Sequence, residues 1–539
     1  MEPMSLRKFG LALFFVSLPL SSLPSLNTPS IPQQKKGTGL LALKDGRFIF
    51  DRPMKKVEAG VEILFPHGKV VVPERLIADF YNDKLDLTRE PRNEKERQKI
   101  EKGYVFFQKR WVKKKVAQKL LARILKKRKK DLEERKAHTL WRNRYIVKTK
   151  DFTFEHNIPP ELFENLKSLF QVYLKTFMKK WKRKPELAHK PVINLYANIE
   201  DYRQISGASG GIVGWYSPSS NQLHFFWDFT DPASTLNTMF HETNHMLADM
   251  INGDFRYPAW IEEPMAEYYG GSKWDPKKKK ITPGQIQPGR LTVVKLGIKE
   301  GKTFTLKQLF RMERFGAVHY AWGWTFIHFL MKTPKYAKRF EKFYLDLAHK
   351  KGIKRKIFYG KVKTVTPEVA ESLLLKYLKV KSLDQLQKEW MAYVKKLQVN
   401  SLEGMERAGT RFIMFGEEKM GRKLLEKAVK MGAKSPVTYT TLAQALYRTP
   451  EERRRALALL DKAAQIDPLF AVIYYRKGQI LGSFNSMTKK KEGLRNLYLA
   501  SEIEPDNWKY QNAIVDLETE IEEESKGSKK KKDSGSPKR

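Results

Sequence analysis

The residues best placed to do chemistry are two histidines and a glutamate in the stretch 240–246, which reads FHETNHM. His241 and His245 are four residues apart, so on a helix they project from the same face and can reach one metal ion. Glu242 lies beside them, where a carboxylate can act as a general base toward water. The flanking side chains are apolar, which favours a buried helix, and buried imidazoles need partners. This H-E-x-x-H spacing predicts a catalytic zinc centre.

A catalytic zinc needs a third protein ligand and one open position. Residues 260–268, WIEEPMAEY, resemble the second motif of the gluzincin metallopeptidases, W-x-x-E-G-x-A-x-Y. The resemblance implies that Glu263 is the third ligand, with Glu262 as the alternative if the alignment slips by one residue. It also implies that Glu267, on the same helix face, hydrogen-bonds the second nitrogen of a zinc histidine. Pro264 stands where the family usually has glycine, and proline is accepted in the first turn of a helix.

A wider resemblance covers about residues 141–397. Residues 214–223 fit the strand pattern G-x-Y-x-P-x-x-N-x-L, the two zinc motifs follow, and a helical segment with HYAW at 319–322 comes after them. This order is similar to that of a peptidase-MA-like domain of unknown function, found in uncharacterised secreted bacterial proteins. The resemblance implies a gluzincin fold, in which a mixed sheet packs on the active-site helices. It implies no established substrate.

The same resemblance suggests residues that would handle the substrate. In zincins an edge strand before the zinc helix lines the cleft and pairs with extended substrate backbone, a role implied here for Leu223, His224 and Phe225. We interpret His224 as a sheet-facing side chain and not as a metal ligand. In aminopeptidase-type gluzincins a tyrosine from a later helix stabilises the oxyanion, which points to Tyr320, with His319 as the alternative.

The expected reaction is zinc-dependent hydrolysis of a peptide bond in a peptide or protein substrate, with Glu242 as general base. The G-x-M-x-N signature, with which aminopeptidases bind a free amine, is absent, and this favours an endopeptidase. One alternative is a catalytically silent zinc-binding scaffold that acts through helical repeats and a basic surface. Another is a zinc amidase that acts on cell-wall peptides. The loop 270–290, rich in Gly, Pro and Lys, has no predicted catalytic role.

Composition limits the classes of protein and site. The 539 residues are 41% hydrophobic and 12% aromatic, which is typical of a folded chain of two or three domains. Cysteine is absent, so disulfides and thiolate metal sites are excluded. The net charge of +43 would attract an anionic polymer such as one at the cell surface, although a generally basic solvated surface is the simpler interpretation. No motif predicts specific nucleic-acid binding.

The N-terminus resembles an export signal. Arg7 and Lys8 precede the apolar run 9–20, which is too short to span a bilayer comfortably but suits a signal peptide over residues 1–26. We therefore expect an exported protein, located in the periplasm, at the cell surface or in the medium. Retention by an uncleaved N-terminal anchor is the alternative.

The expected fold class is α+β, with a thermolysin-like or gluzincin-like catalytic domain between smaller units. In the C-terminal part, prolines at 436, 468 and 505 are 32 and 37 residues apart, close to the 34 of a tetratricopeptide (TPR) repeat. TPR-like hairpins there would offer a groove for a protein partner, and a plain helical cap is the alternative. The predicted units are a small β-rich module (39–80), a charged helical connector (81–140) with a helix over 113–134, the catalytic domain (141–400), TPR-like repeats (401–517) and a disordered basic tail (518–539).

Overall fold

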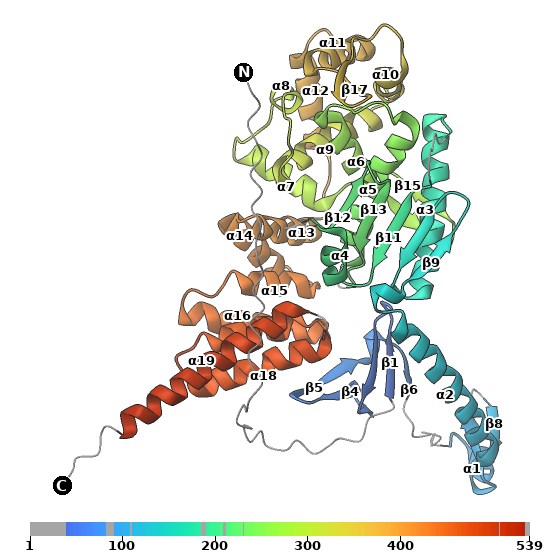
Figure 1. Cartoon of the computed structure of the whole chain (residues 1–539), viewed down its shortest axis with the longest axis vertical. Coiled ribbons are helices and arrows are strands. Elements are labelled where there is room, and N and C mark those ends of the chain that lie inside the picture. Colours follow the sequence, from blue (N-terminus) through green and yellow to red (C-terminus); the bar gives the residue numbers. More distant parts are fainter. Residues whose placement is uncertain are drawn as a thin grey trace, which may run out of the picture.

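The computed structural model describes residues 39–81, 91–107, 110–184, 190–208, 212–229, 231–505 and 507–533. The predicted signal peptide, residues 1–26, lies outside this part of the chain. Figure 1 shows a mixed region of helices and strands at the top, a β-rich module below it and a series of helices that leads to the C-terminus. The predicted mixture of helices and sheets with a helical C-terminal region is confirmed. Within the described ranges, no helix has both the length and the apolar character that crossing a bilayer requires.

The β-rich module has six strands in two three-stranded sheets, with the orders β2-β1-β6 and β3-β4-β5. The first residue of β4 must be glycine: Gly60 has a φ of +144°, and a Cβ there would lie 2.0 Å from the carbonyl oxygen of Val72. The elements are β1 (Gly39–Leu43), β2 (Phe48–Arg52), β3 (Met54–Val57), β4 (Gly60–Phe65), β5 (Gly68–Pro73), η1 (Glu74–Leu76) and β6 (Ile77–Tyr81).

The connector contains the predicted helix and a hairpin that was not predicted. The helix over 113–134 is present as α2, Lys114–Ala137, which extends away from the rest of the molecule in Figure 1. The hairpin forms because the aromatic strands β7 (Tyr104–Phe107) and β8 (Arg110–Lys113) pair their side chains across the ribbon, with Phe106 opposite Trp111. A short helix, α1 (Glu94–Glu101), precedes the hairpin.

A five-stranded mixed sheet organises the upper region, in the order β12-β13-β11-β10-β9. The inner strands β10, β11 and β13 are parallel, and both edge strands are antiparallel to their neighbours. The crossover helix α3 (Pro160–Trp181) begins with proline at its first position and buries an apolar face. The other elements are η2 (Trp141–Asn143), β9 (Tyr145–Lys148), β10 (Thr153–His156), β11 (Val192–Tyr196), α4 (Ile199–Ser206), β12 (Gly214–Ser217) and β13 (Gln222–Phe226).

The expectation that Leu223, His224 and Phe225 form the edge strand was wrong. They lie in β13, which is hydrogen-bonded on both sides, to β12 and to β11. The edge strand is β12, which forms the start of the segment 214–223 and was not distinguished in the sequence from the strand that follows it. His224 faces the sheet as predicted: its Nδ1 lies 2.9 Å from the Tyr196 hydroxyl, and its ring stacks on Trp215.

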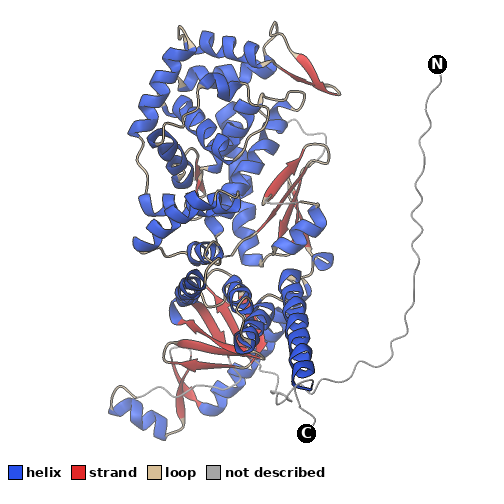
Figure 2. Cartoon of the chain, turned by 90° about the vertical axis from the view of Figure 1, so that its left-hand side faces the viewer, coloured by secondary structure: helices blue, strands red, loops and turns tan. Residues whose placement is uncertain are grey.

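Helices cover this sheet and fill most of the upper region (Figure 2). Its core contains five fully buried tryptophans, at positions 181, 260, 322, 324 and 390. Two small hairpins join the helices. The elements are α5 (Pro232–Asn252), α6 (Ala259–Gly270), β14 (Lys273–Asp275), β15 (Lys280–Thr282), α7 (Pro288–Lys299), α8 (Leu306–Phe310), α9 (Ala317–Lys332), α10 (Ala337–His349), β16 (Lys356–Tyr359), β17 (Val362–Thr364), α11 (Pro367–Leu378) and α12 (Leu383–Lys396).

The C-terminal helices pack as consecutive antiparallel pairs. The first helices of these pairs, α13, α15 and α17, begin 35 and 36 residues apart, near the predicted repeat length. Close packing needs small residues: a Cβ at Gly478 would lie 2.5 Å from Leu497 and 2.9 Å from the carbonyl oxygen of Gly493. The helices are α13 (Ser401–Met414), α14 (Glu418–Lys430), α15 (Pro436–Gln444), α16 (Pro450–Ile466), α17 (Val472–Gly482), α18 (Met487–Ile503) and α19 (Trp508–Asp533).

The prediction of a disordered tail from residue 518 was wrong as far as Asp533, because α19 continues to that residue. The cause is a contact distant in sequence. Lys490 of α18 is 3% exposed, and its ammonium group binds the carboxylates of Glu520 and Glu524. The acidic stretch that looked unstructured by composition therefore forms an ordered helix face.

The α13 helix packs against α7 of the upper region. A Cβ at Gly404 would lie 2.1 Å from the Thr292 hydroxyl, and a Cβ at Gly289 would lie 2.8 Å from the Arg407 side chain. Ala408 of α13 and Leu424 of α14 belong to the same buried apolar cluster as the sheet and the upper helices. The first helical pair is thus part of the upper core.

The β-rich module and the later C-terminal helices share a second core, which the sequence did not suggest. Apolar residues of β1, β4 and β5 cluster with buried residues of α15, α16 and α17. Arg47 lies 2.7 Å from Asp467, and the His67 ring stacks on Tyr498. The two ends of the described chain therefore form one unit.

Replacing Arg47 with alanine should destabilise this unit. The Arg47 and Asp467 side chains are only 17% and 10% exposed, so loss of the guanidinium leaves a largely desolvated carboxylate. We expect the free energy of unfolding to fall by about 2 kcal/mol, measured by denaturant unfolding of the full chain. Lys489→Ala removes a half-exposed pair with Glu492 and should change it by less than about 0.5 kcal/mol. Equal effects of the two variants would contradict the shared core.

Candidate metal centre

The two histidines of the motif lie on α5, as the spacing predicted. Asp231 caps this helix by accepting a hydrogen bond from the Ser234 backbone N–H, and Pro232 occupies the first position. Buried apolar side chains hold the helix in the core. His241 and His245 are left on a face where each side chain remains slightly exposed, 13% and 14%. Helix packing thus fixes both rings while leaving them reachable.

The glutamates come from α6, whose start differs from the expectation. The helix begins at Ala259, so Pro264 lies in its interior and not in its first turn. A neighbouring glycine accommodates the proline ring: a Cβ at Gly323 of α9 would lie 2.5 Å from Pro264 Cγ. The α6 and α9 helices therefore pack closely at the residue where the chain departs from the family motif.

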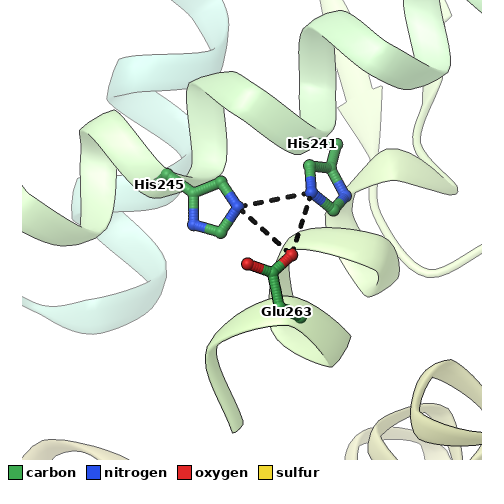
Figure 3. Close-up of side chains that lie close together, drawn as sticks. All are labelled: His241, His245 and Glu263. Carbon is green, nitrogen blue, oxygen red and sulfur yellow. Dashed lines mark hydrogen bonds and ion pairs between the residues drawn. The ribbon is translucent and has the colours of Figure 1, made fainter. Parts of the chain in front are cut away.

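Three ligand atoms converge between α5 and α6 (Figure 3). The Nε2 atoms of His241 and His245 are 3.3 Å apart, and Glu263 Oε2 lies 3.4 Å from the first and 3.7 Å from the second. A tetrahedral zinc with ligand bonds of about 2.1 Å requires donor separations of about 3.4 Å. The triangle therefore fits zinc in both donor type and size.

A second layer of carboxylates supports both imidazoles. Glu267 Oε1 lies 3.3 Å from the Nδ1 atom of His241, the contact that the resemblance implied. Glu262 Oε1 lies 3.7 Å from the Nδ1 atom of His245, so Glu262 is not placed as a metal ligand. A carboxylate at Nδ1 holds the ring orientation and directs Nε2 toward a metal.

Each supporting carboxylate is bound by an arginine. Arg290 Nε lies 2.9 Å from Glu267 Oε2, and a second guanidinium nitrogen contacts the other carboxylate oxygen. Arg256 Nε lies 2.7 Å from Glu262 Oε2. The charge of Arg290 also lowers the pKa of Arg411, on α13, to about 10. The first C-terminal helix, α13, thus lies near the arginine that holds Glu267.

The pKa values of the triad follow from burial and neighbouring charges. Burial opposes charge on Glu263, but hydrogen bonding and attraction from the two histidines lower its pKa to about 2. Burial lowers the pKa of His245 to about 4. Burial also acts to lower the pKa of His241, but hydrogen bonds with Glu263 and Glu267 outweigh it and raise this pKa to about 10. Near neutral pH, His241 thus carries a proton that metal binding would displace.

Glu242 lies at the side of the triad that faces β12. Its Oε1 is 4.0 Å from His241 Nε2, and the backbone N–H of Tyr216 on β12 donates a hydrogen bond to its carboxylate. Burial raises the pKa of Glu242 to about 7, despite the nearby charge of His241. A carboxylate with this pKa can take up a proton and return it at neutral pH.

The structure brings only one of the two oxyanion candidates to the triad. The Tyr320 hydroxyl donates a hydrogen bond to Glu263, and its ring centre lies 6.0 Å from that of His241. His319 instead caps the start of α9, where its Nδ1 accepts from the Gly316 backbone N–H at 3.0 Å. Its ring packs on Phe304 and Phe315.

Sequence reasoning missed three residues of the centre. Arg256 and Arg290 had no predicted role, and Glu262 was considered only as a ligand. The sequence does contain a signal for Glu262. It is adjacent to Glu263, so it could contact Nδ1 of a histidine whose Nε2 faces the metal together with Glu263. No local pattern marks the arginines: Arg290 lies 23 residues from Glu267, in the first turn of α7.

Comparisons of the chain with protein-family models, with curated proteins and with solved structures gave no match.

Proposed function

We propose that this protein is a zinc-dependent peptidase of gluzincin type, acting as an endopeptidase. The observation that carries the proposal is the triangle of His241, His245 and Glu263, whose edges suit zinc, with the Glu242 carboxylate beside it. The mixed sheet with an antiparallel edge strand next to α5 is consistent with a gluzincin-like fold. An exported location, expected from residues 1–26, is part of the same proposal.

In this proposal the side chains share the work of hydrolysis. His241, His245 and Glu263 would hold the zinc, which when bound supplies Lewis-acid polarisation of the scissile carbonyl and of water. Glu242 accepts the proton of the attacking water and passes it to the leaving amine. Tyr320 stays protonated, because burial and nearby carboxylates raise its pKa, and it donates a hydrogen bond to the developing oxyanion.

The substrate would lie along β12 and not along β13. The outer edge of β12 has no strand partner among the described residues, and its Tyr216 N–H contacts Glu242. An extended peptide added to this edge would pass directly beside the base and the triad. In strand addition the protein binds the substrate mainly through main-chain hydrogen bonds and less through side chains. This mode suits an endopeptidase of broad sequence preference.

The test combines metal analysis with digestion of a peptide library by the full chain. The proposal expects about one zinc per chain and cleavage at internal peptide bonds that a chelator abolishes. Zinc binding without cleavage of any peptide would favour a silent scaffold. Hydrolysis of cell-wall peptide fragments, without cleavage of the library peptides, would instead indicate a zinc amidase.

Tyr320→Phe should separate catalysis from metal binding. We expect kcat to fall by about 10²- to 10³-fold with little change in KM, since the lost hydrogen bond forms to the oxyanion and not to the substrate. Zinc content should be unchanged. The matched variant His319→Gln alters the neighbouring side chain, which caps α9, and should keep kcat within about threefold. Loss of activity in His319→Gln but not in Tyr320→Phe would reverse the assignment.

A further inference from the structure

The hairpin β16–β17 carries an apolar tip that no described residue covers. The side chains of Ile357, Phe358 and Tyr359 are 73%, 61% and 80% exposed. The ribbon has only two strands and its side chains alternate between two open faces, so consecutive residues are all exposed. Isolated exposed apolar residues are ordinary, but a cluster of three large ones marks a surface that meets a partner.

Basic side chains surround this tip. Lys354, Lys356, Lys361 and Lys363 are exposed. No acidic residue occurs anywhere between positions 350 and 366. The tip is thus apolar at its end and strongly cationic around its sides.

The hairpin is held firmly at its base. The Lys363 backbone N–H donates to the carbonyl oxygen of Asp254, and the Lys363 carbonyl oxygen accepts from the Arg256 backbone N–H, both at 2.8 Å. Arg355 Nε donates to the carbonyl oxygen of Leu347 at 2.8 Å. These contacts fix the ribbon at the upper end of the molecule, opposite the C-terminal helices (Figures 1 and 2).

We propose that this hairpin docks the protein on an anionic phospholipid bilayer. Ile357, Phe358 and Tyr359 enter the boundary between head groups and acyl chains, and the lysines contact lipid phosphates. Large aromatic and aliphatic side chains are stable at this depth, and lysine stems reach the head groups. The net charge of +43 adds long-range attraction to the same surface.

Other partners fit this tip less well. A stable protein interface needs about 800 Å² from each partner, more than three side chains on a narrow ribbon supply. A soluble anionic polymer would satisfy the lysines but leave the apolar tip in water. A membrane interface accommodates both features, and this docking does not depend on the peptidase activity.

The test is co-sedimentation of the full chain with vesicles at physiological salt. We expect binding to phosphatidylglycerol–phosphatidylcholine vesicles and not to pure phosphatidylcholine vesicles. The triple variant Ile357→Ser, Phe358→Ser and Tyr359→Ser should lower the partition coefficient at least about tenfold. Replacing Lys361 by alanine should lower it about fivefold.

A control pair and a spectroscopic reading complete the design. Met414→Ser with Phe415→Ser removes two side chains that are 64% and 61% exposed at the end of α13, far from the hairpin, and should leave binding unchanged. An environment-sensitive fluorophore attached to Phe358→Cys, which would be the sole cysteine of the chain, should shift its emission to shorter wavelength on anionic vesicles.

Two results would overturn the docking site. One is unchanged binding by the triple variant, which would mean that net charge alone attracts the protein to lipid. The other is emission from the labelled Phe358→Cys protein that stays at the water-exposed wavelength when the protein is bound to vesicles. Complete competition by soluble polyphosphate, with no effect of the triple variant, would assign the surface to an anionic polymer.

Discussion

Glu242→Gln is expected to leave zinc bound while peptide hydrolysis falls by about 10²- to 10⁴-fold. The amide keeps the shape of the side chain and its hydrogen bond from the Tyr216 N–H. It cannot accept a proton from water, so the attacking water is not activated and the leaving amine is not protonated. The measurement is kcat on an unstructured fluorogenic peptide, with zinc content determined on the same sample.

The control is Glu164→Gln, which changes an exposed carboxylate on α3 by the same substitution. Its activity should stay within about twofold of the parent protein, since surface changes of this kind have small effects. If Glu242→Gln retained full activity, Glu242 would be removed from the mechanism. If it lost both zinc and activity, the glutamate would be needed for metal binding instead.

Glu263→Gln and Glu262→Gln form a second, matched pair with a large expected difference. Glu263 contacts the Nε2 atoms of both histidines, so its loss removes one of three ligands and should weaken zinc binding on the order of a thousandfold. Among the histidine nitrogens, Glu262 contacts only Nδ1 of His245, so its loss should weaken binding by about 10- to 100-fold. Competition with a zinc chelator measures both affinities.

The order of the two effects is the informative result. Far UV circular dichroism should be the same for both proteins, because the substitutions are isosteric and lie on the same turn of α6. A larger loss in Glu262→Gln would shift the third ligand by one residue and contradict the placement of α6. Equal and small losses would mean that two histidines bind the metal without a carboxylate.

The parts of the centre that sequence could predict are those set by short spacings. Two imidazoles one turn apart must share a helix face, and Glu263 and Glu267 must do the same on α6. Which of two adjacent glutamates faces the triad depends on the rotation of α6 about its axis. Packing of Pro264 against Gly323 contributes to that rotation, and no local pattern contains this contact.

The remaining expectations failed where the outcome depends on tertiary placement that no local pattern contains. The edge position was assigned to residues 223–225 because β12 (Gly214–Ser217) was not recognised as a separate strand, and residues 218–221 form the turn between β12 and β13. The tail was predicted to be disordered from its composition, yet Lys490 orders it from 30 residues away. His319 and Tyr320 are neighbours in sequence, and only the placement of α9 shows which one reaches Glu263.

The packing of α13 on α7 changes where this protein can be divided. The sequence places a domain boundary at residue 400, but Ala408 and Leu424 lie beyond it and are embedded in the upper core. A fragment ending at 400 would expose the side of α7 that includes Thr292, two residues from the arginine that holds Glu267. The smallest autonomous piece that carries the metal ligands therefore extends at least through Lys430.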